Sequence, residues 1–167
     1  MTTRTTKMTV DRAPLSIVFH EMRSDVQESL QTVLSHPVLA VLVPDWVGQL
    51  NVYYESIDGQ AFATAGSSME YARTQVTVCP EWMNQNADFQ WSSAIHEICH
   101  AHVFPVQDFA KKLLDMACQE TPEVRAIMEA ELQARVEMAA TSIERAIVRA
   151  LMVWKADKQR TPFCEEK

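Results

Sequence analysis

The sequence has no excess of basic residues and no cluster of them. Lysine and arginine number 15 against 22 aspartate and glutamate residues, so the net charge is −7 and the pI is near 5.2. Nucleic acids and anionic membrane surfaces are bound through positive patches or stripes, which this sequence lacks. We therefore expect neither a nucleic acid nor a membrane among its partners.

The sequence also has few cysteines, no C-x-x-C pair and no long apolar run. With 167 residues, 47% of them hydrophobic, the chain can build one core without disulfide bonds. Residues 1–14 are polar and threonine-rich, unlike a secretory signal, and the apolar run at 38–43 is too short to cross a membrane. We expect a cytoplasmic protein with a flexible tail at 1–14 and a single domain at 15–167. The thiols expected to be reduced are Cys79, Cys99, Cys118 and Cys164.

The first half of the domain is expected to hold one helix and a small sheet. Apolar residues at helical spacing predict a helix that begins near Leu15 or Met22 and ends at Ser35. The pattern then alternates between apolar and polar residues; Asp58-Gly59 predicts a tight hairpin turn and Gly66-Ser67-Ser68 a second turn. We expect an α+β fold with a three-stranded, mostly antiparallel sheet, its strands at 49–55, 60–65 and 71–78.

The second half of the domain is expected to be helical. Asp88 can cap a helix at 89–104 that Pro105 ends, and a shorter helix follows at 106–119. Thr121-Pro122-Glu123 supplies a cap, a first-turn proline and an acidic first turn for a long final helix. We expect that helix to pack on the domain along an apolar stripe formed by Val124, Ile127, Leu132, Val136, Ile143, Ile147, Leu151 and Trp154.

The segment His96-Glu97-Ile98-Cys99-His100 indicates a metal site. On a helix, residues four apart share a face, so His96 and His100 can bind one metal ion through their imidazole rings. Glu97 lies about 100° around the helix, where it can act on a water molecule beside the ion without being a ligand. This arrangement is typical of enzymes that hydrolyse peptide bonds.

A catalytic zinc usually has three protein ligands, and the sequence limits the choice of the third. Val103 and Val106 stand where a metzincin needs glycine and histidine, which excludes that class. His102 lies about 200° around the helix from His100 and cannot reach the same ion. The remaining candidates are acidic: Glu137 is preferred, and Glu144 and Glu120 are the alternatives.

The chain resembles the compact gluzincin metallopeptidases. The features that carry the resemblance are a sheet, the helix with His96 to His100, a connecting helix and the run Val136-Glu137-Met138-Ala139-Ala140. The chain is similar in particular to the short single-domain metallopeptidases that phages and prophages often encode, over residues 38–155. Cys99 departs from the small residue, often glycine, that is common at its position. The resemblance implies a zincin-like helical half that binds Zn²⁺ through His96, His100 and Glu137.

The same resemblance implies how a substrate would be held and cleaved. Glu97 would be the general base, and a peptide or protein substrate would lie along an edge strand, expected to be Arg73–Val78. The candidate donors to the transition-state oxyanion are Tyr54, Tyr71 and Arg145. The main hypothesis is therefore a zinc metallopeptidase. The alternatives are a non-catalytic, zinc-stabilised protein-binding module or regulator and an interaction protein without metal.

Overall fold

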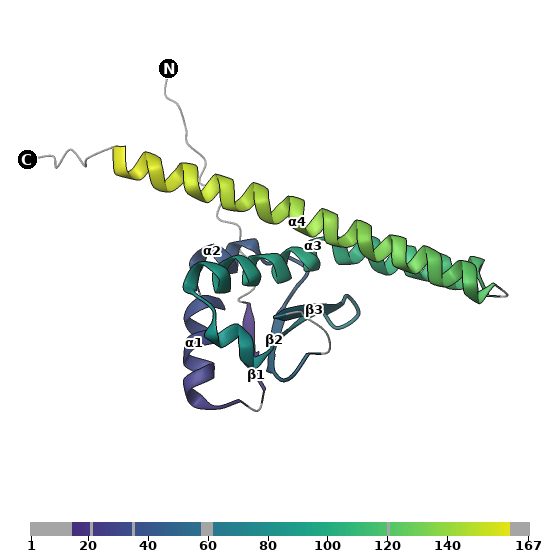
Figure 1. The fold of residues 1–167 in the computed structure, drawn as a ribbon, viewed down its shortest axis with the longest axis horizontal. Helices are drawn as coiled ribbons and strands as arrows, with labels where there is room; N and C mark the ends of the chain where they lie inside the picture. The colour runs from purple at the N-terminus through teal and green to yellow at the C-terminus, as the bar shows by residue number, and fades with distance from the viewer. Residues whose placement is uncertain (1–14, 21, 35, 58–61, 120, 161–167) are drawn as a thin grey trace, which may run out of the picture.

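A mixed sheet and several helices make up an α+β fold, shown in Figure 1. The computed structural model describes residues 15–20, 22–34, 36–57, 62–119 and 121–160. In chain order the elements are β1 (Ser16–Phe19), α1 (Ser24–Leu34), α2 (Pro37–Leu42), β2 (Gln49–Tyr54), β3 (Ala63–Ser68), β4 (Arg73–Val78), a 3-10 helix (Pro80–Asn84), α3 (Ala87–Ala117) and α4 (Pro122–Arg160).

The sheet has four strands in the order β1-β2-β4-β3, so the prediction of a three-stranded, mostly antiparallel sheet is wrong. Strands β1, β2 and β4 run parallel, and β3 alone is antiparallel to its neighbour β4. Parallel partners are distant in the chain, since Ser16 pairs with Gln49, so no local turn signal reports them. Strand β1 also occupies the place where the helix was expected to begin near Leu15, and the predicted turn Asp58-Gly59 lies outside the described residues.

The edge of the sheet next to the helical half is β3, which corrects the expectation that Arg73–Val78 is that edge. Gly66, Ser67 and Ser68 belong to β3 and pair with β4 instead of forming a turn. The chain turns later, where the amide of Ala72 donates to the carbonyl of Met69 at 3.1 Å and Ala72 adopts a φ of 48°. Among the described residues no strand pairs with the outer edge of β3.

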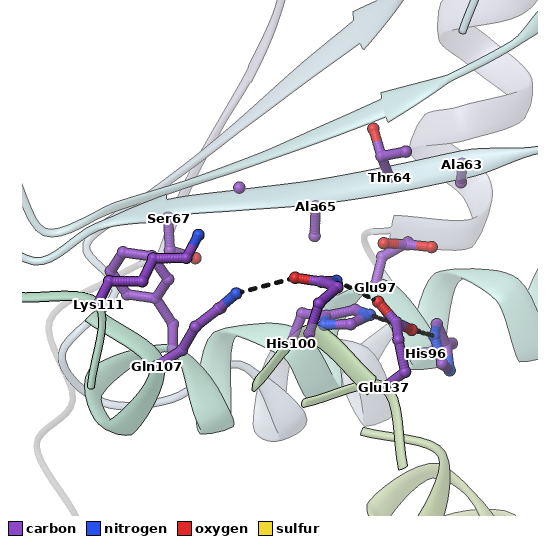
Figure 2. Close-up of a pocket in the computed structure, with 13 residues that line it drawn as sticks. Ala63, Thr64, Ala65, Ser67, His96, Glu97, His100, Gln107, Lys111 and Glu137 are labelled. Carbon is purple, nitrogen blue, oxygen red and sulfur yellow. Dashed lines mark hydrogen bonds and ion pairs between the residues drawn. The ribbon is translucent and has the colours of Figure 1, made fainter. Parts of the chain in front are cut away.

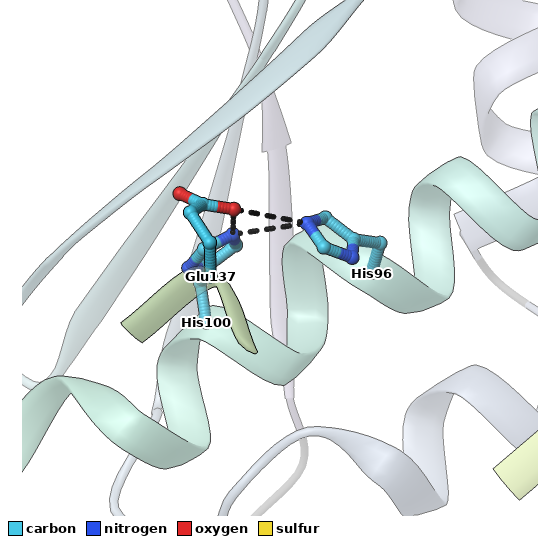
Figure 3. A group of neighbouring side chains, drawn as sticks. All are labelled: His96, His100 and Glu137. Carbon is cyan, nitrogen blue, oxygen red and sulfur yellow. Dashed lines mark hydrogen bonds and ion pairs between the residues drawn. The ribbon is translucent and has the colours of Figure 1, made fainter. Parts of the chain in front are cut away.

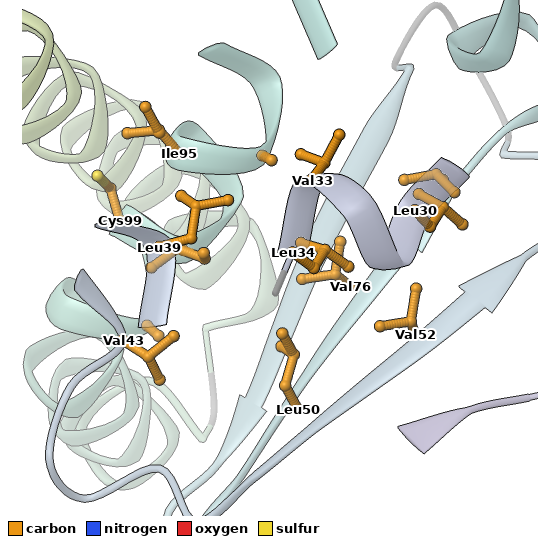
Figure 4. Packing of buried hydrophobic residues seen from close by; sticks show 14 of the residues in the cluster. Leu30, Val33, Leu34, Leu39, Val43, Leu50, Val52, Val76, Ile95 and Cys99 are labelled. Carbon is orange, nitrogen blue, oxygen red and sulfur yellow. The ribbon is translucent and has the colours of Figure 1, made fainter. Parts of the chain in front are cut away.

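One hydrophobic core joins the sheet to α1, α2 and the first half of α3 (Figure 4). Aliphatic side chains of β2 and β4 are buried, and each fully buried one contributes on the order of 1.5–3 kcal/mol. The first half of α3 is thereby fixed on the sheet. The core includes Leu30 and Leu34 of α1, Leu39 of α2, Leu50, Val52, Val76 and Val78 of the sheet, and Ile95, Ile98 and Cys99 of α3.

Helix α3 is longer than predicted. It begins after Asn86, whose side chain accepts a hydrogen bond from the amide of Phe89 at 2.9 Å, so the cap is Asn86 and not Asp88. It continues through Pro105 to Ala117 as one helix of 31 residues, where two were expected. A proline inside a helix costs about 3 kcal/mol, and we attribute the continuity of α3 to the packing of α4 along it.

Helix α4 begins at Pro122, as predicted, and lies antiparallel beside α3 (Figure 1). The second half of α3 and the first part of α4 form a two-helix hairpin, and its outer end extends beyond the sheet (Figure 1). We call residues 106–117 and 122–135 of this hairpin the arm. The predicted stripe packs on the domain only in part. Ile143 and Ile147 contact the core, whereas Val124 and Ile127 are 49% and 70% exposed because no described part of the chain covers the arm there. In the described part of the chain, neither these long helices nor any other is apolar enough to span a membrane.

Candidate metal centre

Two histidines of α3 and one glutamate of α4 face one another where the arm leaves the domain (Figure 3). The Nε2 atoms of His96 and His100 lie 3.2 Å apart. The Oε2 atom of Glu137 lies 3.5 Å from the first of these nitrogens and 3.4 Å from the second. Each residue thus offers one ligand atom to a common point, and the group could hold a metal ion.

Glu144, an alternative third ligand in the sequence, contacts the other side of the His96 ring. Its Oε2 atom lies 3.1 Å from Nδ1 of His96. An ionised carboxylate can only accept, so Nδ1–H of His96 donates to Glu144 and Nε2 keeps its lone pair for an ion. The two glutamates were considered as competing ligands; in the structure they occupy different positions around the same histidine, and Glu144 orients the ring.

A chain of hydrogen bonds holds the outer oxygen of Glu137. The side-chain amide of Gln133 donates to Oε1 of Glu137 at 2.7 Å, and the side-chain amide of Gln107 donates to the side-chain Oε1 of Gln133 at 3.3 Å. With Oε1 held in this way, Oε2 faces the two histidines. The chain also links α3 to α4 across the hairpin, so the position of the carboxylate depends on the pairing of the two helices.

Glu97 is buried beside the ligand group, with only 6% of the residue exposed. Burial raises the pKa of Glu97 to about 7; His96 opposes this rise, while the carboxylates of Glu137 and Glu144 add to it. Burial also lowers the pKa of His100, against the opposing effect of Glu137, and this favours the neutral ring that a metal ligand requires. His100 can therefore serve as a neutral nitrogen ligand, and Glu97 is a carboxylate that exchanges a proton readily near neutral pH.

The ligand group and Glu97 line a pocket of about 670 Å³ between β3, α3 and α4, shown in Figure 2. Residues 63–67 of β3 lie above α3 and have small side chains, which leaves the space between strand and helix open. A Cβ atom added at Gly66 would meet nothing within 4 Å. Away from the histidines, the pocket is lined by Phe104, Gln107, Lys111 and Gln133.

Other residues singled out in the sequence lie away from this group. His102 is on the far side of α3, as predicted, where its Nε2 atom lies 2.6 Å from the carbonyl oxygen of Leu42. Cys99 is fully buried in the core, and burial raises the pKa of its thiol to about 12. Glu120 lies outside the described residues. None of the predicted oxyanion donors, Tyr54, Tyr71 and Arg145, lines the pocket.

The sequence reasoning did not identify Gln133, Gln107 or the role of β3. Gln133 stands four residues before Glu137, and this spacing could have suggested a contact on the helix surface. Gln107 and β3 had no comparable signal, because their approach to the site depends on how the helices and the sheet pack.

Comparison with protein-family models, with curated proteins and with solved structures found no match for this chain.

Proposed function

We propose that the chain is a zinc-dependent peptidase in which Glu97 activates the water that attacks the peptide bond. The observation that carries this proposal is the triangle of ligand atoms from His96, His100 and Glu137, with sides of 3.2, 3.4 and 3.5 Å, beside the buried Glu97 in an open pocket. Two histidines and one glutamate form the ligand set of one well-known class of catalytic zinc site.

The triangle fits the geometry of a tetrahedral zinc ion. Zinc binds nitrogen and carboxylate oxygen at about 2.0–2.2 Å, which places two ligand atoms of a tetrahedron about 3.3–3.5 Å apart. The observed separations of 3.2 to 3.5 Å agree with this value. The bond from Glu144 to His96 adds the outer carboxylate that commonly orients a zinc-binding histidine.

The residues of the chain divide the reaction between them. Zinc, when bound, would supply a Lewis acid that makes water more acidic and polarises the scissile carbonyl. Glu97 would accept a proton from the attacking water as its oxygen bonds to the carbonyl carbon. As the carbon–nitrogen bond breaks, Glu97 would return the proton to the leaving amine. A carboxylate with a pKa of about 7 is well matched to both transfers near neutral pH.

Strand β3 would hold the substrate. Its outer edge carries backbone groups that pair with no other described strand, and residues 63–67 lie directly above α3. An extended peptide could add to this edge by main-chain hydrogen bonds. At about 3.3 Å per residue, β3 would align a segment of roughly four or five residues over the ligand group. The expected substrate is therefore a peptide or an unfolded protein segment in extended form.

The open pocket favours a catalytic site over a structural one. Structural zinc sites are closed by four protein ligands, whereas the group in the described part of the chain has three and faces a pocket of about 670 Å³. The alternative of a non-catalytic, zinc-stabilised binding module has no comparable observation in its favour.

The proposal is tested by metal analysis and by cleavage of an unfolded protein. Elemental analysis of the purified chain should find close to one zinc per chain. Denatured casein, incubated with the zinc-loaded chain, should be cut into peptides that mass spectrometry detects. The substitution Glu97→Gln keeps the shape of the side chain but removes the base, so the rate should fall at least about 100-fold while the zinc content stays the same.

Two outcomes would count against the proposal. If Glu97→Gln cleaved casein as fast as the unchanged chain, Glu97 would not be the base and the cleavage would have another source. If the chain bound one zinc tightly but cleaved neither casein nor a mixture of random peptides, the non-catalytic module would be the better interpretation.

A further inference from the structure

The arm carries a stripe of large apolar side chains that no described part of the chain covers. On α3 these residues recur at intervals of three or four, and on α4 two more stand three residues apart. Each is between 48% and 72% exposed. We call this set the apolar face of the arm; it comprises Val106, Phe109, Leu113 and Met116 of α3 and Val124 and Ile127 of α4.

Helical geometry places both stripes on the same side of the hairpin. Leu114 of α3 and Leu132 of α4 are half-buried and mark the sides on which the two helices contact each other. At about 100° per residue, each exposed stripe lies roughly 100–120° from that contact side, in the same rotational sense on both helices. The two helices are antiparallel (Figure 1), so the same rotation from the contact side of each helix brings both apolar stripes to one common face of the hairpin.

The apolar face is larger than a monomer usually exposes. At roughly 200 Å² for a fully exposed large side chain, the exposed fractions amount to roughly 700 Å². The largest apolar patch on a typical soluble monomer is about 300–600 Å². Two such faces in contact would bury roughly 1,400 Å², within the range of about 1,200–2,000 Å² of stable protein interfaces.

Several charges of the arm are paired with one another. Lys112 lies 2.6 Å from Asp108, and Arg125 lies 2.6 Å from Asp115 and 2.9 Å from Glu129. Acidic and basic residues are nearly equal in number on the arm, so it does not select an acidic or a basic partner by its charge. A second copy of the same face is complementary to it, because a twofold contact sets the same apolar side chains against each other.

We propose that two copies of this chain associate through the apolar faces of their arms and form a four-helix bundle. A two-helix layer cannot bury its own outer face, and a second two-helix layer is the simplest cover for it. The estimated area agrees with that of a stable dimer.

The proposed contact would leave the pocket open. Gln107 and Lys111, which line the pocket, lie roughly 120–160° around α3 from Phe109 and Leu113. Dimerisation and the proposed peptidase activity therefore occupy different sides of the helix. Either can fail in an experiment without the other.

Sedimentation velocity of the full chain between about 1 and 100 µM tests the dimer. The unchanged chain should sediment with twice the monomer mass of 19.0 kDa at the higher concentrations. The double substitution Phe109→Glu and Ile127→Glu places two charges in the contact and should weaken association at least about 100-fold. Both sites are exposed, so circular dichroism and zinc content should not change.

Met152→Glu is the matched control, since Met152 is an exposed apolar residue of α4 outside the arm. It should leave the dimer intact. Should the double glutamate variant aggregate, Leu113→Gln with Met116→Gln gives a second and milder test of the same face. The proposal is overturned if the unchanged chain remains a monomer at 100 µM. It is also overturned if the dimer persists in both arm variants or is lost in Met152→Glu.

Discussion

The two halves of α3 have the same apolar spacing but different surroundings. In residues 87–104, Ile95 and Ile98 are 3% and 2% exposed because the sheet, α1 and α2 cover them. In residues 106–117, Phe109 and Leu113 are four residues apart and so also share one face of the helix, but they are 63% and 48% exposed. The periodic pattern therefore predicts which face of a helix is apolar, whereas the neighbouring elements decide whether that face is covered.

The three residues that could hold a metal ion lie where the covered half meets the exposed half. His96 and His100 come from the part of α3 that the core fixes, and Glu137 comes from α4 just past the arm. A rigid helix thus presents two ligands, and the third depends on the pairing of α3 with α4. We therefore expect substitutions on the covered half to reduce zinc affinity or the free energy of unfolding strongly, and substitutions toward the arm to reduce them less.

The largest effect should come from removing a ligand on the covered half. His100→Ala should lower zinc affinity more than 100-fold, beyond the 10- to 100-fold typical for residues that only orient a ligand, because one of three donors is lost. His102→Ala is its control, since His102 lies on the other side of the same helix, against Leu42. Competition with a fluorescent zinc chelator measures both. Equal losses in the two variants would show that helix integrity, and not ligation, controls binding.

The next effect compares two aliphatic residues on the two halves. Ile98→Ala should reduce the free energy of unfolding by about 2–5 kcal/mol, because it leaves a cavity in the core. Leu113→Ala should change it by less than about 0.5 kcal/mol when measured below the concentration at which the chain associates. Urea denaturation at about 1 µM provides both values. A large loss for Leu113→Ala in that monomeric sample would mean that the arm is covered within one chain.

The smallest effect concerns the two residues that hold ligands in place. Glu144 is 20% exposed in its side chain and contacts His96, so Glu144→Ala should weaken zinc binding about 10- to 100-fold. Gln133 bonds to Glu137 at the more exposed side, and Gln133→Ala should weaken it less than about 10-fold. Glu144→Gln should recover part of the loss, because an amide oxygen can still accept from Nδ1–H. If Gln133→Ala lost more zinc affinity than Glu144→Ala, the contact of Gln133 with Glu137 would matter more for zinc binding than the contact of Glu144 with His96.

The helices and the ligand pair could be predicted because their signals are local. His96 and His100 are four residues apart, and a single helix determines that they share a face. Glu137 and Glu144 both lie at the edge of an apolar stripe, so their spacing did not separate them; Glu137 was preferred, and the structure does bring it to both histidines. Pro105 misled the prediction, because local preference favours an end where the packing of α4 supports a continuous helix.

The sheet could not be predicted from local patterns. The pairing of Ser16 with Gln49 and of Gln49 with Arg73 joins segments far apart in the chain, and parallel strands share no hairpin turn that would reveal them. For this reason the sequence did not reveal that β3, and not Arg73–Val78, is the edge strand above α3. The exposure of Val124 and Ile127 was missed for a similar cause, since an apolar stripe does not report the absence of a neighbour.

The sequence by itself determined which long segments are helical, which of their faces are apolar and that two imidazoles with a carboxylate beside them share one helical turn. These properties follow from the spacing of residues along a regular backbone. Only the tertiary structure decided that Glu137 lies beside both histidines, that Glu144 contacts the ring of His96, that β3 lines the pocket and that no described part of the chain covers the apolar face of the arm. Each of these depends on the distance between elements remote in the chain, which packing sets and local spacing does not.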